Sequence, residues 1–499
     1  MGSARRRIRF RRRSLVATAL GAALLSMAVA TPAAGQQPGP DDPLPDPIPE
    51  EPVPAGFGLT VEEVVTLPRS EPTPAPTDPR LMRWARINYL GELPDGSGRH
   101  YVPDLNGTLY FAEDGEPHPY LDVKAAVGAN FWSGRGLGTG FGFVAFHPNF
   151  ARNGKFYTVH TEALDALQTE TPDLVSQPDP SHHGVITEWT ADDPAADTFS
   201  GTHREILRVG YRTFIHGFQE IAFNPTARRG NADYGLLYVG SGDGGAGVAA
   251  TDAQNLGMPQ GKILRIDPAG RSSANGQYGI PRRNPFVGTP GALGEIYAYG
   301  IRNPHRFSWD PAWPHRMYLG HIGDKRVESI YEVKAGDNYG WTEREGPFVV
   351  KDGDPNCDVY PLPADDPSFG FTYPVAAYDH ERDPALSGCA DSGHAVIGGF
   401  VYRGRGVPAL RGRYLFGDDV SGRLFFTERR EMRRGRDLAT IHELAVFDES
   451  GQPTTMQELA GDERVDLRFG RDAEGELYIL SKANGTIWEV TGTRPFRPL

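Results

Sequence analysis

"FQEIAFNPTARRGNADYGLLYVGSGD", residues 218–243, joins two short apolar runs through a turn that is rich in Pro, Asn, Asp and Gly. The second run ends in Leu-Tyr before a glycine-rich stretch. Short runs of β-branched and aromatic residues with such turn residues between them are typical of a β-hairpin. We therefore predict two antiparallel strands here.

The same hairpin-like unit recurs along the chain. The further copies lie at 98–115, 141–159, 306–324, 412–428 and 465–480. Six such units over about 400 residues favour a closed ring of four-stranded blades, because closure removes exposed strand edges. The sequence thus predicts an all-β fold, a six-bladed β-propeller. A pair of β-sandwiches is the alternative, although the spacing of the units is long for it.

Three segments of different composition divide the chain. Residues 1–34 have a basic start, an apolar stretch and small residues, as expected of a signal peptide for export by the general secretory or the twin-arginine route. Residues 35–79 are rich in Pro, Asp, Glu and Thr and are predicted to be a disordered linker. The propeller is expected over residues 80–495. These features predict a periplasmic or extracellular protein with no stable membrane insertion once the signal is cleaved.

The charge balance narrows the possible partners. Removing the signal segment takes away seven arginines and no acids, so the formal net charge falls from -13 to -20. A chain this acidic is not expected to bind nucleic acid. Its two cysteines, Cys357 and Cys389, are most simply a disulfide in an exported protein.

Candidate catalytic residues lie at the two ends of the 218–243 hairpin. His216 stands just before its first strand, and Asp243 closes it. A carboxylate on one ring nitrogen would fix the imidazole tautomer and leave the other nitrogen as a base. The alternative is a turn histidine and a turn aspartate that never touch.

Two further polar groups follow later strands. "RNPH" places Arg302, Asn303 and His305 after a strand-like run, where donors at a channel mouth would suit an anionic, carbonyl-rich ligand. Hydrogen bonds between blades are the alternative role. Gly323 and Asp324 form a tight turn whose oxygens could bind a hard cation, or which is a plain turn.

Three longer motifs identify a resemblance. "GKILRIDP" (261–268), the run from Tyr278 to Pro311 and "AGDNYGWTEREG" (335–346) are similar to the glucose/sorbosone dehydrogenase family, over roughly residues 85–492. These are soluble sugar dehydrogenases that use pyrroloquinoline quinone (PQQ) and calcium on a six-bladed propeller. Hedgehog-interacting proteins are relatives thought not to be enzymes.

The resemblance implies a role for each candidate. His216 matches the family's general base and Asp243 the aspartate that orients it. Arg302 and Asn303 match residues that contact the quinone. Gly323 and Asp324 match the turn whose backbone oxygens hold calcium.

The chain also departs from the family pattern. Gly138 or Thr139 stands where the family has a glutamine, and His305 where glucose-oxidising members have Gln. The lysine and arginine that hold the cofactor carboxylates fall near Val420, Val465 and Leu467. Arg464 and Arg468 are one residue out of that register, and a one-residue slip on a strand changes the face.

These observations leave three hypotheses. The first is an exported quinoprotein that oxidises an aldose sugar or polyol by hydride transfer to PQQ, with calcium and an unidentified electron acceptor. The second is a non-catalytic propeller that binds carbohydrate or protein. A lactonase that uses calcium is a third.

Overall fold

The computed structural model describes residues 39–113, 115–380, 389 and 394–497. The expected signal peptide, residues 1–34, lies outside them. Strands account for most of the regular structure, with only short helices between them. No helix in the described part is long and apolar enough to cross a membrane.

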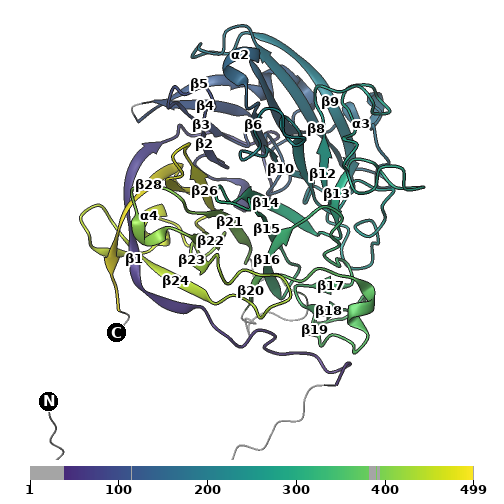
Figure 1. Ribbon diagram of the computed structural model, residues 1–499. Coiled ribbons are helices and arrows are strands. Elements are labelled where there is room, and N and C mark those ends of the chain that lie inside the picture. The colour runs from purple at the N-terminus through teal and green to yellow at the C-terminus, as the bar shows by residue number, and fades with distance from the viewer. Residues whose placement is uncertain (1–38, 114, 381–388, 390–393, 498–499) are drawn as a thin grey trace, which may run out of the picture. The chain divides into compact units, whose positions relative to one another are not determined.

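Six blades, numbered here in chain order, make up the fold (Figure 1). Blade 1 consists of β2 (Leu90–Glu92), β3 (His100–Pro103), β4 (Thr108–Glu113) and β5 (Glu116–Asp122). Blade 2 consists of β6 (Phe143–Phe146), β7 (Lys155–Glu162), β8 (His182–Ala191) and β9 (Gly201–Tyr211). Blade 3 consists of β10 (Phe218–Phe223), β11 (Leu237–Ser241), β12 (Lys262–Ile266) and β13 (Ile296–Tyr299).

The second half of the chain builds the other three blades. Blade 4 consists of β14 (Asn303–Trp309), β15 (Met317–Ile322), β16 (Val327–Val333) and β20 (Ala376–Asp379). Blade 5 consists of β21 (Val396–Val401), β22 (Arg413–Asp418), β23 (Leu424–Glu428) and β24 (Ile441–Phe447). Blade 6 consists of β26 (Leu467–Arg471), β27 (Leu477–Ser481), β28 (Thr486–Pro495) and β1 (Val53–Thr66).

Short strands, helices and 3₁₀ turns lie in the loops between the blade strands. A three-stranded sheet follows β16: β17 (Arg344–Glu345), β18 (Phe348–Val350) and β19 (Val359–Tyr360), and the short β25 (Pro453–Thr454) pairs with β24. The α-helices are α1 (Val123–Val127), α2 (Phe150–Asn153), α3 (Ala166–Thr169) and α4 (Met456–Ala460). The 3₁₀ turns are η1 (Pro79–Leu81), η2 (Gly128–Asn130), η3 (Asp366–Phe369) and η4 (Pro408–Leu410).

Six hydrophobic cores, one between each pair of neighbouring blades, close the ring. Blades 1 to 5 are joined in turn by four of these clusters, and the remaining two join blade 5 to 6 and blade 6 to 1. The last one packs Tyr478 and Ile487 of blade 6 against Leu90 and Val102 of blade 1. Burying apolar area on both faces of every blade is what stabilises this arrangement. The prediction of an all-β, six-bladed propeller is confirmed.

The repeated units correspond to hairpins at two different depths. Units 141–159, 218–243, 306–324 and 465–480 form the two innermost strands of blades 2, 3, 4 and 6. The looser units 98–115 and 412–428 form the middle hairpins, β3–β4 and β22–β23. The repeat looks irregular in the sequence because these two units correspond to the second and third strands of their blades, and the other four to the first and second.

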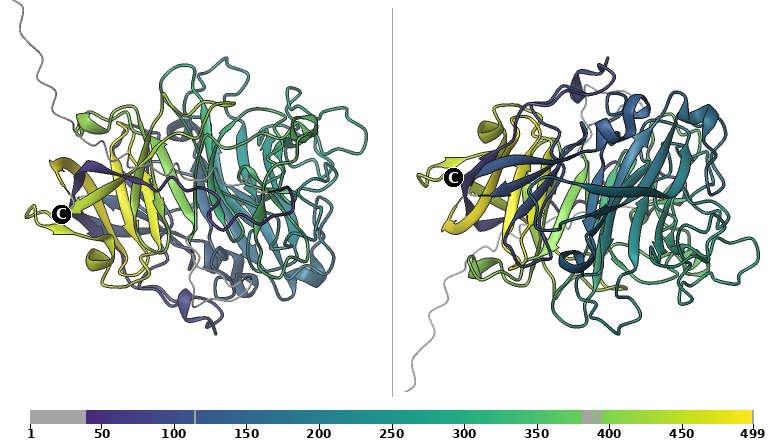
Figure 2. Two further views of the ribbon diagram at one scale, coloured as in Figure 1. Left: turned by 90° about the horizontal axis from the view of Figure 1, so that it is seen from below. Right: turned by 90° about the horizontal axis from the view of Figure 1, so that it is seen from above.

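The prediction of a disordered linker over residues 35–79 is wrong for the described part that contains β1. This strand pairs antiparallel with β28, from Phe57 to Thr66, and parallel with β24, from Val53 to Thr60. In both views of Figure 2 the purple β1 lies beside the yellow end of the chain. Its apolar residues Leu59 and Val61 pack in the core between blades 5 and 6. The N-terminal strand therefore completes the last blade, and the fold begins before residue 80.

Candidate functional site

His216 and Asp243 lie at opposite ends of the innermost hairpin of blade 3 and contact each other. Nδ1 of His216 is 2.8 Å from Oδ1 of Asp243. His216 has a positive φ of 53°, and its carbonyl accepts a hydrogen bond from Gly244 N at 3.0 Å. Residues in such sparsely populated backbone conformations cluster at functional sites. The turn thus aims the imidazole directly at the carboxylate.

Asp243 is fixed by three donors in addition to its burial. Its exposed fraction is 2%. Oδ2 accepts a hydrogen bond from Trp341 Nε1 at 2.9 Å, and Oδ1 accepts one from Gly245 N at 2.8 Å. Burial alone would raise the pKa of Asp243, but His216, Arg302 and the Gly245 N–H outweigh it and hold the pKa below 3.8. Asp243 is therefore an anion that orients the imidazole.

The His216 ring is suited to act as a base. Burial lowers its pKa below 6.5, and Arg302 lowers it further against the opposing effect of Asp243. The imidazole is therefore neutral at pH 7. Nε2 makes no hydrogen bond within the described chain, and the ring lines a cavity of about 250 Å³ at one mouth of the central channel.

The same cavity collects the other candidate side chains. Arg302, Asn303, His305, Gly323 and Asp324 all line it. They come from the start of β14 and from the turn after β15, one blade beyond His216. The structure thus brings together every candidate of the site, with Asp243 directly behind His216.

Arg302 is held by the glycine turn. Its Nη1 donates to Gly323 O at 2.5 Å, and its Nη2 is 2.9 Å from Asp324 Oδ1. Burial alone would lower the pKa of Arg302, but Asp324 and Asp243 outweigh it and raise that pKa above its usual range. The guanidinium is a fixed cation beside the neutral imidazole.

Asn303 and His305 offer polar atoms that the protein leaves unsatisfied. Asn303 Oδ1 and His305 Nδ1 are buried and have no hydrogen-bond partner in the described part of the chain. Burial, followed by Arg306 and Arg468, lowers the pKa of His305 well below 6.5. Unpaired buried polar groups are costly, so such atoms at a cavity wall indicate a polar ligand.

Three cations, which the sequence analysis did not place in the site, face this cavity from blade 6: Arg464, Arg468 and Lys482. Val465 and Leu467, where the family's clamp was expected, are buried in the core between blades 5 and 6 instead. Because side chains alternate along a strand, Arg468 then points to the channel. Arg464 and Arg468 thus line the cavity although they are one residue out of the family's register.

Lys482 is the least satisfied of these cations. It follows β27 and is 5% exposed, and its ammonium has no hydrogen bond or ion pair among the described residues. Burial, then Arg468, lowers its pKa well below 10.5. By contrast, Arg468 contacts Asp419 and donates to Asn88 Oδ1 at 3.0 Å. A bound anion would stabilise the charged form of Lys482.

The donor set fits the quinone that the resemblance implies. PQQ is a planar group with several carboxylates and two quinone oxygens, all of them acceptors. Arg464, Arg468 and Lys482 could hold its carboxylates, while Arg302 and Asn303 could donate to quinone oxygens. Gly138 also lines the cavity, whereas Thr139 is turned into the loop, where its Oγ1 donates to Gly136 O at 2.9 Å.

The turn expected to hold calcium offers few ligands by itself. Gly323 O and the Asp324 carboxylate are the two oxygens there, and Arg302 engages both. Calcium takes six to eight oxygen ligands. A calcium ion would therefore need the oxygens of the cofactor or water, and a shift of the guanidinium.

Glu345 shapes this turn and was not found by sequence reasoning. Its Oε1 accepts four backbone N–H bonds, from residues 324, 325, 326 and 327, at 2.8–3.0 Å. Burial, with Asp324 next, raises the pKa of Glu345. The "TEREG" motif that contains it was part of the resemblance, but its contact lies about 20 residues away in sequence.

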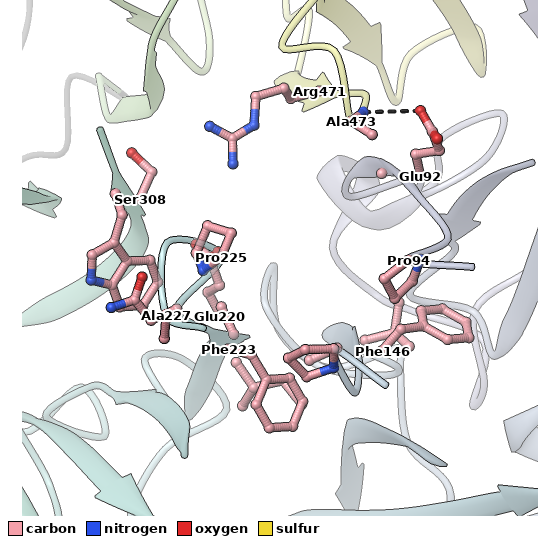
Figure 3. Close-up of a pocket in the computed structure, with 18 of the residues that line it drawn as sticks. Glu92, Pro94, Phe146, Glu220, Phe223, Pro225, Ala227, Ser308, Arg471 and Ala473 are labelled. Atoms are coloured by element: carbon pink, nitrogen blue, oxygen red, sulfur yellow. Dashed lines mark hydrogen bonds between the residues drawn. The ribbon is translucent and has the colours of Figure 1, made fainter. Parts of the chain in front are cut away.

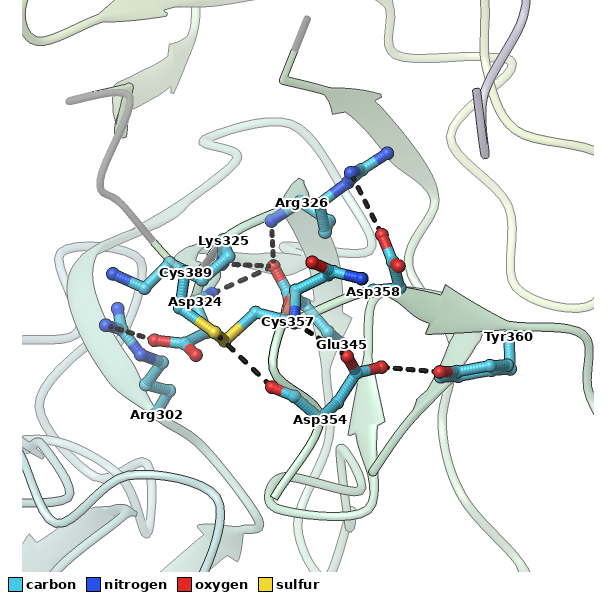
Figure 4. Close-up of a disulfide and its surroundings, with 11 residues drawn as sticks. Arg302, Asp324, Lys325, Arg326, Glu345, Asp354, Cys357, Asp358, Tyr360 and Cys389 are labelled. Atoms are coloured by element: carbon cyan, nitrogen blue, oxygen red, sulfur yellow. Dashed lines mark hydrogen bonds and ion pairs between the residues drawn. A yellow bond between two sulfur atoms is a disulfide. The ribbon is translucent and has the colours of Figure 1, made fainter. Parts of the chain in front are cut away.

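The predicted disulfide is present beside the same turn (Figure 4). Cys357 and Cys389 are joined with Cα atoms 5.1 Å apart. The bond ties the loop after β18 to the segment before β21. It therefore cross-links the chain close to Asp324 and Glu345.

The chain is similar in sequence to known proteins. Residues 90–485 match the sequence family described as Glucose / Sorbosone dehydrogenase. The HIPL1 protein of Arabidopsis thaliana is 28% identical over 87% of this chain and 66% of its own length. The human Hedgehog-interacting protein is 25% identical over 81% of this chain and 50% of its own length. This chain thus spans two thirds or less of these curated relatives.

A solved structure shares the fold. The PQQ-bound aldose sugar dehydrogenase from Streptomyces coelicolor superposes with a TM-score of 0.54 at 20% identity, covering 89% of this chain and all of that one. At this identity the likeness concerns the fold alone.

Proposed function

This chain belongs to the glucose/sorbosone dehydrogenase family, and we propose that it is an exported quinoprotein that oxidises an aldose sugar or polyol with PQQ and calcium. The observation that carries the proposal is the His216–Asp243 pair, whose neutral imidazole faces a cavity lined by cations. A base and an anion clamp in one cavity are what such a reaction requires.

The protein's part in the reaction follows from the geometry. Nε2 of His216 accepts the proton of a sugar hydroxyl, and Asp243 stabilises the imidazolium that forms on the same ring. When bound, PQQ supplies the acceptor for the hydride that leaves the adjacent carbon. Arg302 is placed to stabilise negative charge that develops beside His216.

Cofactor binding is assigned to the cations of blade 6. Lys482 and Arg468 would pair with carboxylates, and Asn303 would donate from its amide. Gly323 O and Asp324 would contribute oxygens to calcium, which requires Arg302 to turn away from them.

An exported location is part of the proposal. A disulfide is typical of oxidising compartments, and Cys357–Cys389 is of this kind. The basic and apolar start of the chain supports the same location.

A second candidate function is binding without catalysis. The observation that favours it is the contact of Arg302 with both oxygens of the calcium turn. In that case the cavity would hold a carbohydrate or a segment of another protein.

Reconstitution distinguishes the two. The purified protein is incubated with PQQ and calcium, and dye reduction is followed with a panel of aldoses and polyols. We expect dye reduction by the wild type and by H118A, a control at an exposed histidine on β5, and none by H216A. No quinone binding and no dye reduction in the wild type would leave the binding function, and full activity of H216A would contradict the mechanism.

A further inference from the structure

A second cavity, of about 520 Å³, opens at the other end of the central channel (Figure 3). Within β10, Phe218 and Gln219 line the first cavity, whereas the residues from Glu220 to Phe223 line the second. Along β26, Arg468 faces the first and Arg471 the second. One end of each of these innermost strands therefore lines the first cavity, and the other end lines the second.

A layer of polar side chains separates the two cavities. Arg306 donates from Nη2 to Asn88 O at 3.0 Å, and Arg468 donates from Nε to Asn88 Oδ1 at 3.0 Å. All three residues line the first cavity and not the second. A ligand in one cavity would therefore not touch a ligand in the other.

Arg471 is an unpaired cation in the second cavity. Its guanidinium lies 4.8 Å from the centre of the Phe400 ring, and it forms no hydrogen bond or ion pair within the described chain. The Nη1 atom is buried. Figure 3 shows the guanidinium reaching into the open space of the cavity. A buried, unpaired guanidinium nitrogen is costly, and a carboxylate matches its two-pronged geometry.

Glu220 supplies a second polar anchor in the same space. It is 6% exposed, and its Oε2 accepts a hydrogen bond from Phe307 N at 2.8 Å. Oε1 has no partner among the described residues, and no ion pair joins Glu220 to Arg471. The Arg471 guanidinium and Glu220 Oε1 are therefore both available to a ligand in this cavity.

The walls of the cavity are aromatic. Aromatic rings from five blades line it, among them Tyr89, Phe143, Phe146, Phe223, Trp309 and Phe400. Pockets of 300–1,000 Å³ with apolar walls and few polar groups are typical of sites for small molecules. The rim acids Glu92 and Asp472 each accept a backbone N–H and do not pair with Arg471.

We propose that this cavity is a second binding site, for a small carboxylate that carries a hydroxylated ring. The ligand carboxylate pairs with Arg471, a ring hydroxyl hydrogen-bonds to Glu220 Oε1, and the ring packs against Phe223 and Phe400. A sugar acid and a hydroxylated aromatic acid share this chemistry. The proposal does not depend on the quinoprotein function, because the residues involved are outside the first cavity.

Calorimetric titration of the purified full chain tests the site. D-glucuronate and 4-hydroxybenzoate are the two probes, and D-glucose is the neutral control. We expect at least one acid to bind, and glucose to bind at least about tenfold more weakly, since hydrogen bonds to a charged group are the stronger ones. The acid that binds identifies the type of ring. Binding of neither acid, or equal binding of glucose, would overturn the proposal.

Variants assign the binding to this cavity. R471A should weaken it about 10- to 100-fold, as expected for loss of a charge-assisted pair. R471K, which keeps the charge but not the fork, should lie between R471A and the wild type, and near-UV circular dichroism verifies that both variants are folded. The exposed arginine variant R405A and the first-cavity variant H216A should bind like the wild type. Unchanged affinity in folded R471A, or loss in H216A, would contradict the assignment.

Discussion

Nδ1 of His216 lies 2.8 Å from Oδ1 of Asp243, although 27 residues separate the two in sequence. The contact closes the innermost hairpin of blade 3 at the channel mouth. It gives one nitrogen a fixed partner and leaves the other facing the cavity. This single relationship sets both the tautomer and the direction of the proposed base.

Replacing Asp243 with Asn should reduce dye reduction by a factor on the order of 10²–10⁴, because an amide does not hold the imidazole in the same tautomer or stabilise its charged form. PQQ affinity, measured by quenching of protein fluorescence, should change little. The control D437N, at an exposed aspartate between β23 and β24, should have full activity. A fully active D243N would show that the pair has no catalytic role.

The pH dependence of the same reaction follows from the pKa of His216. Because burial lowers that pKa, the base form persists below pH 6.5, and activity should fall only at more acidic pH. H216A should lack this acidic limb in any residual activity. An acidic limb at or above pH 6.5 in the wild type would contradict a neutral imidazole.

Removing the Asp324 carboxylate should weaken the binding of calcium more than the binding of PQQ. In D324A only Gly323 O remains of the two oxygens in the turn. We expect the calcium concentration for half-maximal activity to rise about tenfold or more, and chelator to inactivate the variant sooner. The control is D352A, which removes an exposed carboxylate from the loop after β18 and leaves both oxygens of the turn in place. An unchanged calcium requirement would place the ion elsewhere.

Glu220 should make stability depend on pH. Burial, opposed by Arg306 and the Phe307 N–H, raises its pKa from 4.5 to about 7. The folded state therefore holds a proton that the unfolded state loses between these values, so this contribution to stability is full below pH 4.5 and lost as the pH rises through 7. Arg471 and Tyr89 also face this carboxyl group, from β26 and the start of blade 1.

Replacing Glu220 with Gln removes that titration. The free energy of unfolding of E220Q relative to the wild type should rise between pH 5 and pH 8 by roughly 3 kcal/mol, in urea melts at each pH. The exposed control E474Q should show no such trend. If the difference between E220Q and the wild type does not change with pH, Glu220 is not protonated in the native state.

Replacing Asp310, which lies between blades 4 and 5, should strongly lower the free energy of unfolding. It is fully buried, and it pairs with Arg403 at 2.8 Å and with Arg429 at 2.9 Å. D310A leaves two guanidinium groups without their partner, which should lower the free energy of unfolding by about 3–5 kcal/mol. Thermal unfolding checks this, with D352A again as the control. A loss below 1 kcal/mol would mean that the two arginines find other partners.

The sequence allowed prediction of the hairpins and of the residues at their ends. Pairing within a hairpin is local, so the order of its two strands and the nearness of its two ends follow from a turn between two apolar runs. Whether His216 touches Asp243 was decided only by the structure. The motifs around Arg302 and Gly323 likewise lie at the ends of strands that the pattern identifies.

The features that the sequence analysis did not predict correctly depend on contacts between residues that are far apart in the sequence. β1 looks like part of a polar linker, yet it pairs with β28 more than 400 residues later. Lys482 could not be placed in the site because its direction depends on how blade 6 packs against its neighbours. Alternation from the buried Leu467 was the signal that could have found Arg468.

By itself the sequence determined the class of fold, its repeat, the family and the local chemistry of the hairpin ends, because these depend on short-range patterns and motifs. Only the tertiary structure decided which strand closes the ring, which cations face the channel and that Arg471 and Glu220 share a second cavity. Those features depend on how six blades pack around one axis, and packing of that kind joins residues that no local pattern connects.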